Sequence, residues 1–429
     1  MNGSILEGRV AEIGFTGLGM VSAGGVKWWI PGVDIDESVR FAPVEDARGR
    51  RFGRLVEVME PSPHRIVPVC GQADYCSGCV FQHLTYARSL RLKSDAVRIS
   101  LQRNVGCNGV VVTDSPHHPE PLGYRLRAGF RVLSGPAGPT PSLRARNGWE
   151  NVPDLRCCPV QSPRLNQVLG TLFRLSDVAR LAAMCRSVQV GIADASTAYI
   201  HLQAETVLPM KLLDAAIGEL PAEAALFVTS PAGRCLWTHG PAELGLSHAG
   251  RRLLVGPPAW MPVSLSSTRL LHDLLFRLLA PVEGASIIEI GAGVGTLTCS
   301  LTAAKAEVIA VDVNQSAVKF LEKNLGGASG VTIRLGEAHR AVSRCIKAGQ
   351  RATIAILHAI RRPFGAPLAR YLAPLGVERI IYIAPAVMTL VRDITALGAA
   401  GYRMQSIHLL DQLPYSYHLM VVAVLRRRS

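Results

Sequence analysis

The stretch Ser286-Ile-Ile-Glu-Ile-Gly-Ala-Gly-Val-Gly295 decides the fold of the C-terminal part of this chain. Its first five residues are a short, mostly apolar run that is typical of a buried strand, and the glycines that follow permit a tight turn into a helix. A strand, a glycine turn and a helix in this order cradle nucleotide-like ligands in parallel α/β sheets. The structural alternative is that the glycines serve only to pack the helix against the sheet.

Strand-like and helical segments alternate through the rest of the chain, from residue 266 onward. The expected strands are 286–290, 307–311, 331–335, 353–357 and 379–383, followed by an antiparallel pair at 405–410 and 417–425. This alternation predicts an α/β fold with a doubly wound, Rossmann-like sheet. Asp312 ends the second strand and is expected to accept hydrogen bonds from ribose hydroxyls. Glu289 would repel a pyrophosphate but suits the ammonium group of S-adenosylmethionine, although dinucleotide sites look similar.

Two further regions precede this sheet. Short alternating stretches separated by glycine-rich turns predict a small β-barrel over residues 1–62, with one strand stopped by Pro43. Residues 63–265 form a middle region that opens with a cysteine cluster and continues into a basic helix with Leu90, Val97 and Leu101 on one face. We therefore expect three domains, 1–62, 63–265 and 266–429.

Composition and charge restrict the class of protein. The chain has 429 residues, 48% hydrophobic and 18% charged, which excludes disorder and collagen-like structure. No apolar run approaches a membrane span and no secretory signal is evident, so we expect a cytoplasmic protein that is not bound to a membrane. The net charge is +14. The positive charge lies in residues 63–200 (net +8) and 266–429 (net +9), whereas residues 1–62 and 201–265 carry net −2 and −1, and this distribution predicts a polyanionic partner.

The cysteines indicate a metal centre. Cys70, Cys76 and Cys79 have the spacing Cys-x5-Cys-x2-Cys, and Cys157-Cys158 could supply a distant fourth ligand. Three close thiolates and one distant one suit an iron–sulfur cluster. Structural zinc, which usually has two Cys-x2-Cys pairs, and unliganded thiols remain open on spacing alone.

Over nearly its whole length the chain resembles the RNA (uracil-C5)-methyltransferases that act on tRNA and 23S rRNA. Three segments carry the resemblance besides residues 286–312. They are Pro-Val-Cys-Gly-Gln-Ala-Asp-Tyr-Cys-Ser-Gly-Cys-Val-Phe-Gln-His at 68–83, Tyr-Arg-Leu-Arg-Ala-Gly-Phe-Arg at 124–131, and Asp-Leu-Arg-Cys-Cys-Pro at 154–159.

The resemblance implies an OB-like TRAM barrel at the N-terminus, an α+β central domain that holds a [4Fe-4S] cluster, and a C-terminal methyltransferase domain that binds S-adenosylmethionine. It makes Cys158, directly before Pro159, the fourth cluster ligand. It also implies structured rRNA or tRNA as the partner, with no obligate protein partner. The expected cofactor-binding residues are Glu289, Gly291, Gly293, Gly295, Asp312 and Glu337.

The catalytic segments depart from the family's pattern. Family members attack C6 of uracil with a cysteine thiolate, and a carboxylate later removes the C5 proton. Here Pro385 stands at the position of the nucleophile and Met420 at that of the base. The family's Asp-Pro-Pro-Arg becomes His358-Ala-Ile-Arg, and its Phe-Gln-x-Asn is lost around Trp260. We therefore expect no uracil-C5 methylation.

Three functions remain open on these residues. The first is RNA methylation with altered chemistry at a nitrogen or hydroxyl, for which His358 and His418 are weak catalytic candidates. The second is an RNA-binding protein without catalysis, such as an rRNA or tRNA folding factor, and the third is an iron–sulfur sensor. The expected RNA-contacting residues are Arg88, Arg91, Lys93, Arg98, Arg125, Arg127, Arg131 and Arg361.

Overall fold

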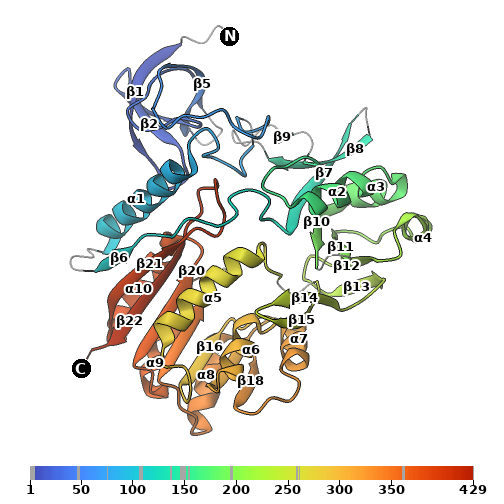
Figure 1. Cartoon of the computed structure of the whole chain (residues 1–429), viewed down its shortest axis with the longest axis vertical. Helices are drawn as coiled ribbons and strands as arrows, with labels where there is room; N and C mark the ends of the chain where they lie inside the picture. Colours follow the sequence, from blue (N-terminus) through green and yellow to red (C-terminus); the bar gives the residue numbers. More distant parts are fainter. Residues whose placement is uncertain are drawn as a thin grey trace.

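The architecture comes from a computed structural model of the chain, which divides into an N-terminal barrel, a central sheet and a C-terminal sheet (Figure 1). The described residues are 5–45, 49–74, 76–105, 110–135, 138–144, 151–152, 155–193, 197–257, 259, 261–359 and 363–428. Among the helices that these residues form, none has the length and apolar character that crossing a membrane requires.

The N-terminal strands close into a barrel, as the sequence predicts. Its members are β1 (Leu6–Ile13), β2 (Gly19–Ala23), β3 (Val26–Ile30), β4 (Ser38–Glu45) and β5 (Arg51–Glu60), in the order β1-β2-β3-β5-β4. Val10, Ile30 and Phe41 fill its interior. The expectation that Pro43 ends a strand is wrong, because β4 continues to Glu45 along β5. The described pairing of β4 with β1 stops at Phe41, so the missing N–H of Pro43 costs no hydrogen bond there.

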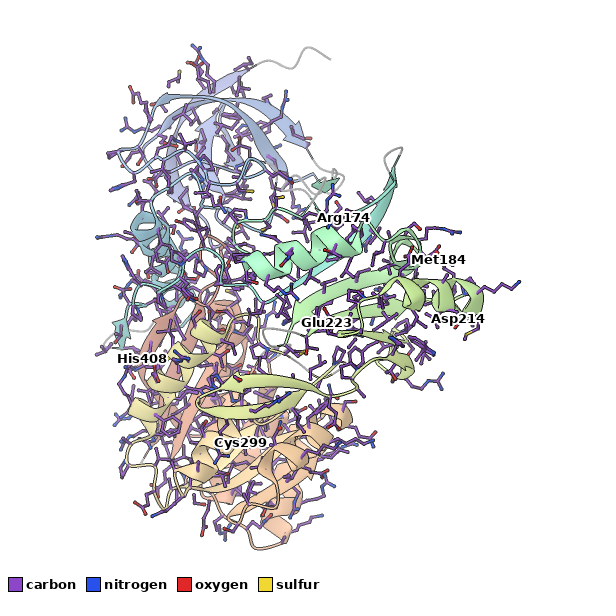
Figure 2. The ribbon with its side chains drawn as sticks, turned by 45° about the vertical axis from the view of Figure 1, so that its right-hand side comes forward. Arg174, Met184, Asp214, Glu223, Cys299 and His408 are labelled. Carbon is purple, nitrogen blue, oxygen red and sulfur yellow. The ribbon has the colours of Figure 1, made fainter. Side chains whose placement is uncertain are left out.

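The central sheet has seven strands in the order β13-β12-β11-β10-β7-β8-β9. They are β7 (Arg127–Gly135), β8 (Gly138–Arg144), β9 (Asn151–Val152), β10 (Cys185–Ile192), β11 (Ala198–Ala204), β12 (Ala224–Thr229) and β13 (Cys235–His239). Three helices pack on one face and share its apolar core: α2 (Pro163–Leu172), α3 (Ser176–Ala183) and α4 (Met210–Glu219). Figure 2 shows Arg174, Met184 and Asp214 on this outer side, away from the C-terminal domain.

The C-terminal sheet has eight strands in the order β18-β17-β16-β19-β20-β22-β21-β6, and β22 runs antiparallel to β20 and β21. The strands are β16 (Ser286–Ile290), β17 (Glu307–Asp312), β18 (Val331–Leu335), β19 (Ile354–His358), β20 (Arg379–Ala384), β21 (Tyr402–Leu410), β22 (Met420–Arg427) and β6 (Val111–Thr113). The predicted α/β class and the final antiparallel pair are confirmed. The chain order changes direction between β16 and β19, which is where such sheets bind ligands at the carboxyl ends of the strands.

Helices cover both faces of this sheet. One core contains residues of α1 (Tyr86–Val105), α8 (Ala338–Lys347), α9 (Gly365–Leu375) and α10 (Val387–Ala399). The core on the opposite face contains residues of α5 (Leu265–Leu279), α6 (Thr296–Ala303) and α7 (Gln315–Leu325). Leu90, Val97 and Leu101 of α1 lie in the first core, so the predicted apolar face of this helix is confirmed.

The limits expected for the middle domain do not follow the packing. Strand β6 lies within residues 63–265 but pairs with β21 of the C-terminal sheet. The hairpin of β14 (Leu244–His248) and β15 (Arg251–Val255) packs against α7, and Leu253 lies in a core of the C-terminal domain. Segments of the middle region therefore complete the C-terminal domain, and α1 is one of its covering helices.

Buried ion pairs join α1 to its neighbours. Lys93 Nζ donates to Asp411 Oδ1 at 2.9 Å, and neither side chain has exposed surface. Tyr86 also donates to Asp411, and Arg88 forms a bidentate pair with the buried Asp34 of the barrel. Burial would raise the pKa of Asp34, but the hydrogen bonds from Arg88 and Ser62 hold it below its usual value. The helix thus connects the barrel to the loop between β21 and β22.

We expect K93M to lower the free energy of unfolding by about 3 kcal/mol, because it leaves the Asp411 carboxylate buried without its cation. The double variant K93M/D411N should recover part of this loss, since it removes the uncompensated charge. Urea denaturation followed by circular dichroism measures both. The matched control is K305M, because Lys305 and Glu283 form an exposed pair. Equal stability of K93M and K305M would contradict a structural role for the buried pair.

Candidate active site

The glycine loop has a backbone that requires glycine. Gly291, Gly293 and Gly295 have φ angles of 86°, 60° and 90°, and Gly295 caps the N-terminus of α6. Residues with a Cβ atom rarely adopt this left-handed backbone conformation, so the loop needs glycine at these three positions. The amide of Gly291 donates to the carbonyl of Val311 at 2.8 Å, which places the loop beside the end of β17.

Asp312 supports this loop from the next strand. Its Oδ2 accepts a hydrogen bond from the Gly293 amide and its Oδ1 from the Asn314 amide, both at 2.8 Å. Asn314 in turn caps α7. The carboxylate therefore stands at the carboxyl edge, where the sequence expects it to meet ribose hydroxyls, and it also fixes the two backbone segments around it.

Glu289 lies beneath the loop, with 1% of its side chain exposed. Thr298 donates to its Oε2 at 2.7 Å, and His358 Nε2 lies 3.2 Å from its Oε1. The sequence predicts this carboxylate beside the ammonium group of S-adenosylmethionine. Each of its oxygens has a partner inside the protein, so Glu289 also positions His358 and α6.

Glu337 lies at the same edge. It precedes α8 and lines a cavity of about 440 Å³ together with Arg340, Arg344 and Tyr371. The neighbouring Gly336 amide donates to the carbonyl of Asp312 at 2.9 Å. The structure thus brings Glu337 close to Asp312 and the glycine loop, although these residues lie up to 46 positions apart in the sequence.

One residue that positions the loop is not predicted from the sequence. Asn324, on α7, donates from Nδ2 to the carbonyls of Val294 and Leu254, and its Oδ1 accepts from the Leu254 amide. It therefore links the glycine loop to the β14–β15 hairpin. No local signal identifies it, because its partners lie 30 and 70 residues away.

The segment that carries the family's nucleophile begins where β20 ends. Pro385 follows Ala384 directly and precedes α10, so it stands at the carboxyl edge but offers no nucleophilic atom. Close by, the buried Asp393 accepts hydrogen bonds from Tyr382 at 2.5 Å and from the amides of Phe364 and Gly365 at 2.7 Å. Asp393 thus joins α10 to the segment after β19. Its hydrogen bond with Tyr382 also links the residues on the two sides of Pro385.

Two further positions expected in catalysis, His418 and Met420, lie just before β22 and at its first residue. Met420 pairs with Leu410 in the sheet and carries no ionisable group. Burial, together with Lys93 and Arg125, lowers the pKa of His418, so its ring is neutral at pH 7. His358 lies elsewhere, beside Glu289 and the glycine loop.

The four expected cluster cysteines come from two segments that meet. Cys79 is buried in a small core with Tyr124 and Val160, against which Cys158 packs. Burial and the nearby Cys158 and Cys76 thiols raise the pKa of Cys79 to about 12. Cys157 is exposed. In the described part of the chain, no three His, Cys, Asp or Glu side chains have the arrangement of a metal site.

Most of the basic residues expected to bind RNA have protein partners. Arg88 and Lys93 form the buried pairs described above, Arg98 pairs with Asp114 at 2.9 Å, and Arg127 donates to Gln189. Arg125 lies next to Tyr124 and the cluster cysteines. Lys93 has no surface from which to reach a phosphate. Arg91 and Arg131 are exposed, whereas Arg361 and Trp260 lie outside the described residues.

We expect D312A to weaken binding of S-adenosylhomocysteine at least tenfold, or about 1.4 kcal/mol, because the carboxylate shapes the loop and faces the expected ribose site. Isothermal titration calorimetry measures the Kd. E307Q, an exposed position at the other end of β17, is the control and should bind like the wild type. Unchanged affinity in D312A would show that Asp312 does not form the cofactor site.

Comparisons with known proteins agree with this arrangement, although no family model matches the chain. An RNA methyltransferase of Caldanaerobacter subterraneus is 23% identical over 99% of this chain and 98% of its own length. The 23S rRNA (uracil(1939)-C(5))-methyltransferase RlmD of Alkalilimnicola ehrlichii is 26% identical over 92% and 90%.

A solved structure supports the same fold. The Pyrococcus abyssi tRNA (uracil-54, C5)-methyltransferase, solved with S-adenosyl-L-homocysteine, superposes with a TM-score of 0.75 at 18% identity, covering 98% of this chain and 99% of that one. Relatives that match the chain from end to end are thus named RNA methyltransferases, and one of them, like the solved structure, is named as a uracil-C5 enzyme.

Proposed function

We propose that this protein is an S-adenosylmethionine-dependent methyltransferase that modifies rRNA or tRNA by a route other than covalent attack on uracil. The observation that carries the proposal is the carboxyl edge of the C-terminal sheet. There the glycine loop with its positive φ angles, Asp312 and Glu337 lie together, and Pro385 stands at the position of the family's nucleophile. S-adenosylmethionine, when bound, supplies an electrophilic methyl group.

The fit to this cofactor rests on the chain's own backbone and charges. Three glycines with positive φ allow a ligand to approach the loop closely, and Asp312 offers a carboxylate to a ribose. Retention of this geometry favours an enzyme over a binding protein without catalysis. The substitutions at Pro385 and Met420 favour the second function, RNA binding alone, and the experiment below separates the two.

The uracil-C5 reaction needs a nucleophile that makes C5 electron-rich. Proline has no lone pair to donate, and the last cysteine of the chain, Cys345, is buried in the core between α8 and the sheet. Methylation of a nitrogen or a hydroxyl requires no such adduct, because the acceptor atom has its own lone pair. The proposed reaction therefore uses positioning and proton removal.

We also propose a [4Fe-4S] cluster held by Cys70, Cys76, Cys79 and Cys158, and a TRAM-like RNA-binding role for the barrel. Two observations support the ligand set. Cys158 packs against the core that contains Cys79, and burial and neighbouring thiols of the set raise the pKa values of Cys70, Cys79 and Cys158. The exposed Arg91 and Arg131 are the proposed phosphate contacts. An enzyme of tRNA or rRNA with these features would work in the cytoplasm.

Nucleoside mass spectrometry on tRNA and rRNA from wild-type and gene-deleted cells tests the function. We expect one methylated nucleoside other than 5-methyluridine to disappear on deletion and to return with a plasmid copy. Persistence of every methylated nucleoside would favour the non-catalytic alternative. Loss of 5-methyluridine, restored by the purified protein, would overturn the proposed change of chemistry.

For the cluster, we expect protein purified without oxygen to hold close to four irons and to show the visible absorption of a [4Fe-4S] centre. C158S should lose most of this iron. C157S is the matched control, because Cys157 is the exposed neighbour in the chain. Equal iron content in the two variants, or zinc in place of iron, would contradict the proposed ligand set.

A further inference from the structure

We propose that His358, oriented by Glu289, is the proton acceptor of the reaction, and that the methylated RNA group is therefore an N–H or O–H. The inference rests on the proposed function and deepens it, because it names the class of acceptor. It does not depend on which RNA is bound.

The position of His358 in the sheet is the first support. It is the last residue of β19, whose neighbours are β16, which leads into the glycine loop, and β20, which leads into Pro385. A Cβ placed on Gly291 would lie only 3.0 Å from the Cβ of His358. The imidazole thus stands between the cofactor loop and the segment that carries the nucleophile in family members.

The hydrogen bond to Glu289 is the second support. Because a carboxylate only accepts hydrogen bonds, the proton of this pair lies on Nε2, and Nδ1 carries the free lone pair. Glu289 is itself fixed by Thr298. Among the described residues, no group hydrogen-bonds to Nδ1, and 11% of the His358 side chain is exposed. The pair therefore presents an oriented base with an unused nitrogen.

The other titratable groups near His358 do not compete for this role. His272, on α5, hydrogen-bonds to His248 at 3.0 Å. Burial, with His248 and His358, lowers the pKa of His272 to about 3, and burial also lowers the pKa of His248. Both rings are neutral near pH 7, so the negative charge that faces His358 is that of Glu289.

The proposed step transfers one methyl group to the RNA atom and removes one proton from it. A lone pair of the acceptor nitrogen or oxygen forms the new bond to the methyl carbon, and the carbon–sulfur bond breaks with its electrons remaining on sulfur. The proton of the acceptor passes to Nδ1 of His358, and Glu289 stabilises the resulting imidazolium. The proton then leaves to water. The products are methylated RNA and S-adenosylhomocysteine, with no oxidant or reductant involved.

The first test needs neither cofactor nor RNA. In protein labelled with ¹⁵N-histidine, the neutral His358 ring should carry its proton on Nε2, with its signals assigned by their absence in H358N. E289Q should lose this preference, because an amide can also donate. A ring with the proton on Nδ1 in the wild type would overturn the proposed pair even if the enzyme is active.

The second test separates binding from chemistry. H358N should bind S-adenosylhomocysteine within about threefold of the wild type but transfer tritiated methyl groups to unmodified tRNA and rRNA transcripts at least about 100-fold more slowly. H408N is the control, because His408 (labelled in Figure 2) lies on β21, four strands away from β16 in the sheet.

The outcomes are distinguishable. Wild-type protein that binds S-adenosylhomocysteine but methylates none of the transcripts overturns the proposed function. Wild-type transfer with H358N as fast as H408N overturns only the role of His358. Wild-type transfer to a carbon atom of the base overturns the inferred class of acceptor.

Discussion

The buried ion pair between Lys93 and Asp411 is the constraint that fixes helix α1, and α1 joins the barrel to the C-terminal domain. Two charges with no exposed surface are tolerated only when they meet, so α1 and the loop after β21 have a fixed relation. From the same helix Arg88 holds Asp34 of the barrel, while Leu90 and Val97 pack on the C-terminal sheet. One helix thereby positions the barrel, the cysteine segment and the loop that leads to Met420 (Figure 1).

The carboxyl edge of the C-terminal sheet shows which features the chain has kept. Asp312 and Asn324 hold the glycine loop by side-chain hydrogen bonds to backbone atoms. Asp393, which follows the family's motif, retains a structural task through Tyr382 and two amides. Pro385 and Met420, in contrast, stand at the two positions whose side chains react with the RNA base in the family that the chain resembles. The proposed change of chemistry therefore concerns the reaction on the RNA, and it leaves the hydrogen bonds that hold the glycine loop in place.

The sequence predicts those parts of the structure whose signal is local. Periodicity identifies the barrel, the doubly wound sheet and the apolar face of α1, and the glycine pattern identifies the loop. Charge is a poor guide to RNA contacts, because Lys93 and Arg88 find carboxylates 318 and 54 residues away. The role of Glu289 beneath the loop and the pairing of β6 with β21 likewise depend on distant partners. Such contacts have no local pattern to reveal them.

In the proposed reaction the methyl group is transferred without a covalent bond between protein and RNA. The most direct measurement uses 5-fluorouridine-substituted tRNA and rRNA transcripts, because fluorine at C5 blocks the release step and traps any adduct formed at C6. Denaturing gel electrophoresis then separates bound from free RNA. We predict no denaturation-resistant complex, with methyl transfer to the same transcripts continuing. A stable complex that requires S-adenosylmethionine would show that another residue replaces the nucleophile and would contradict transfer without a covalent adduct.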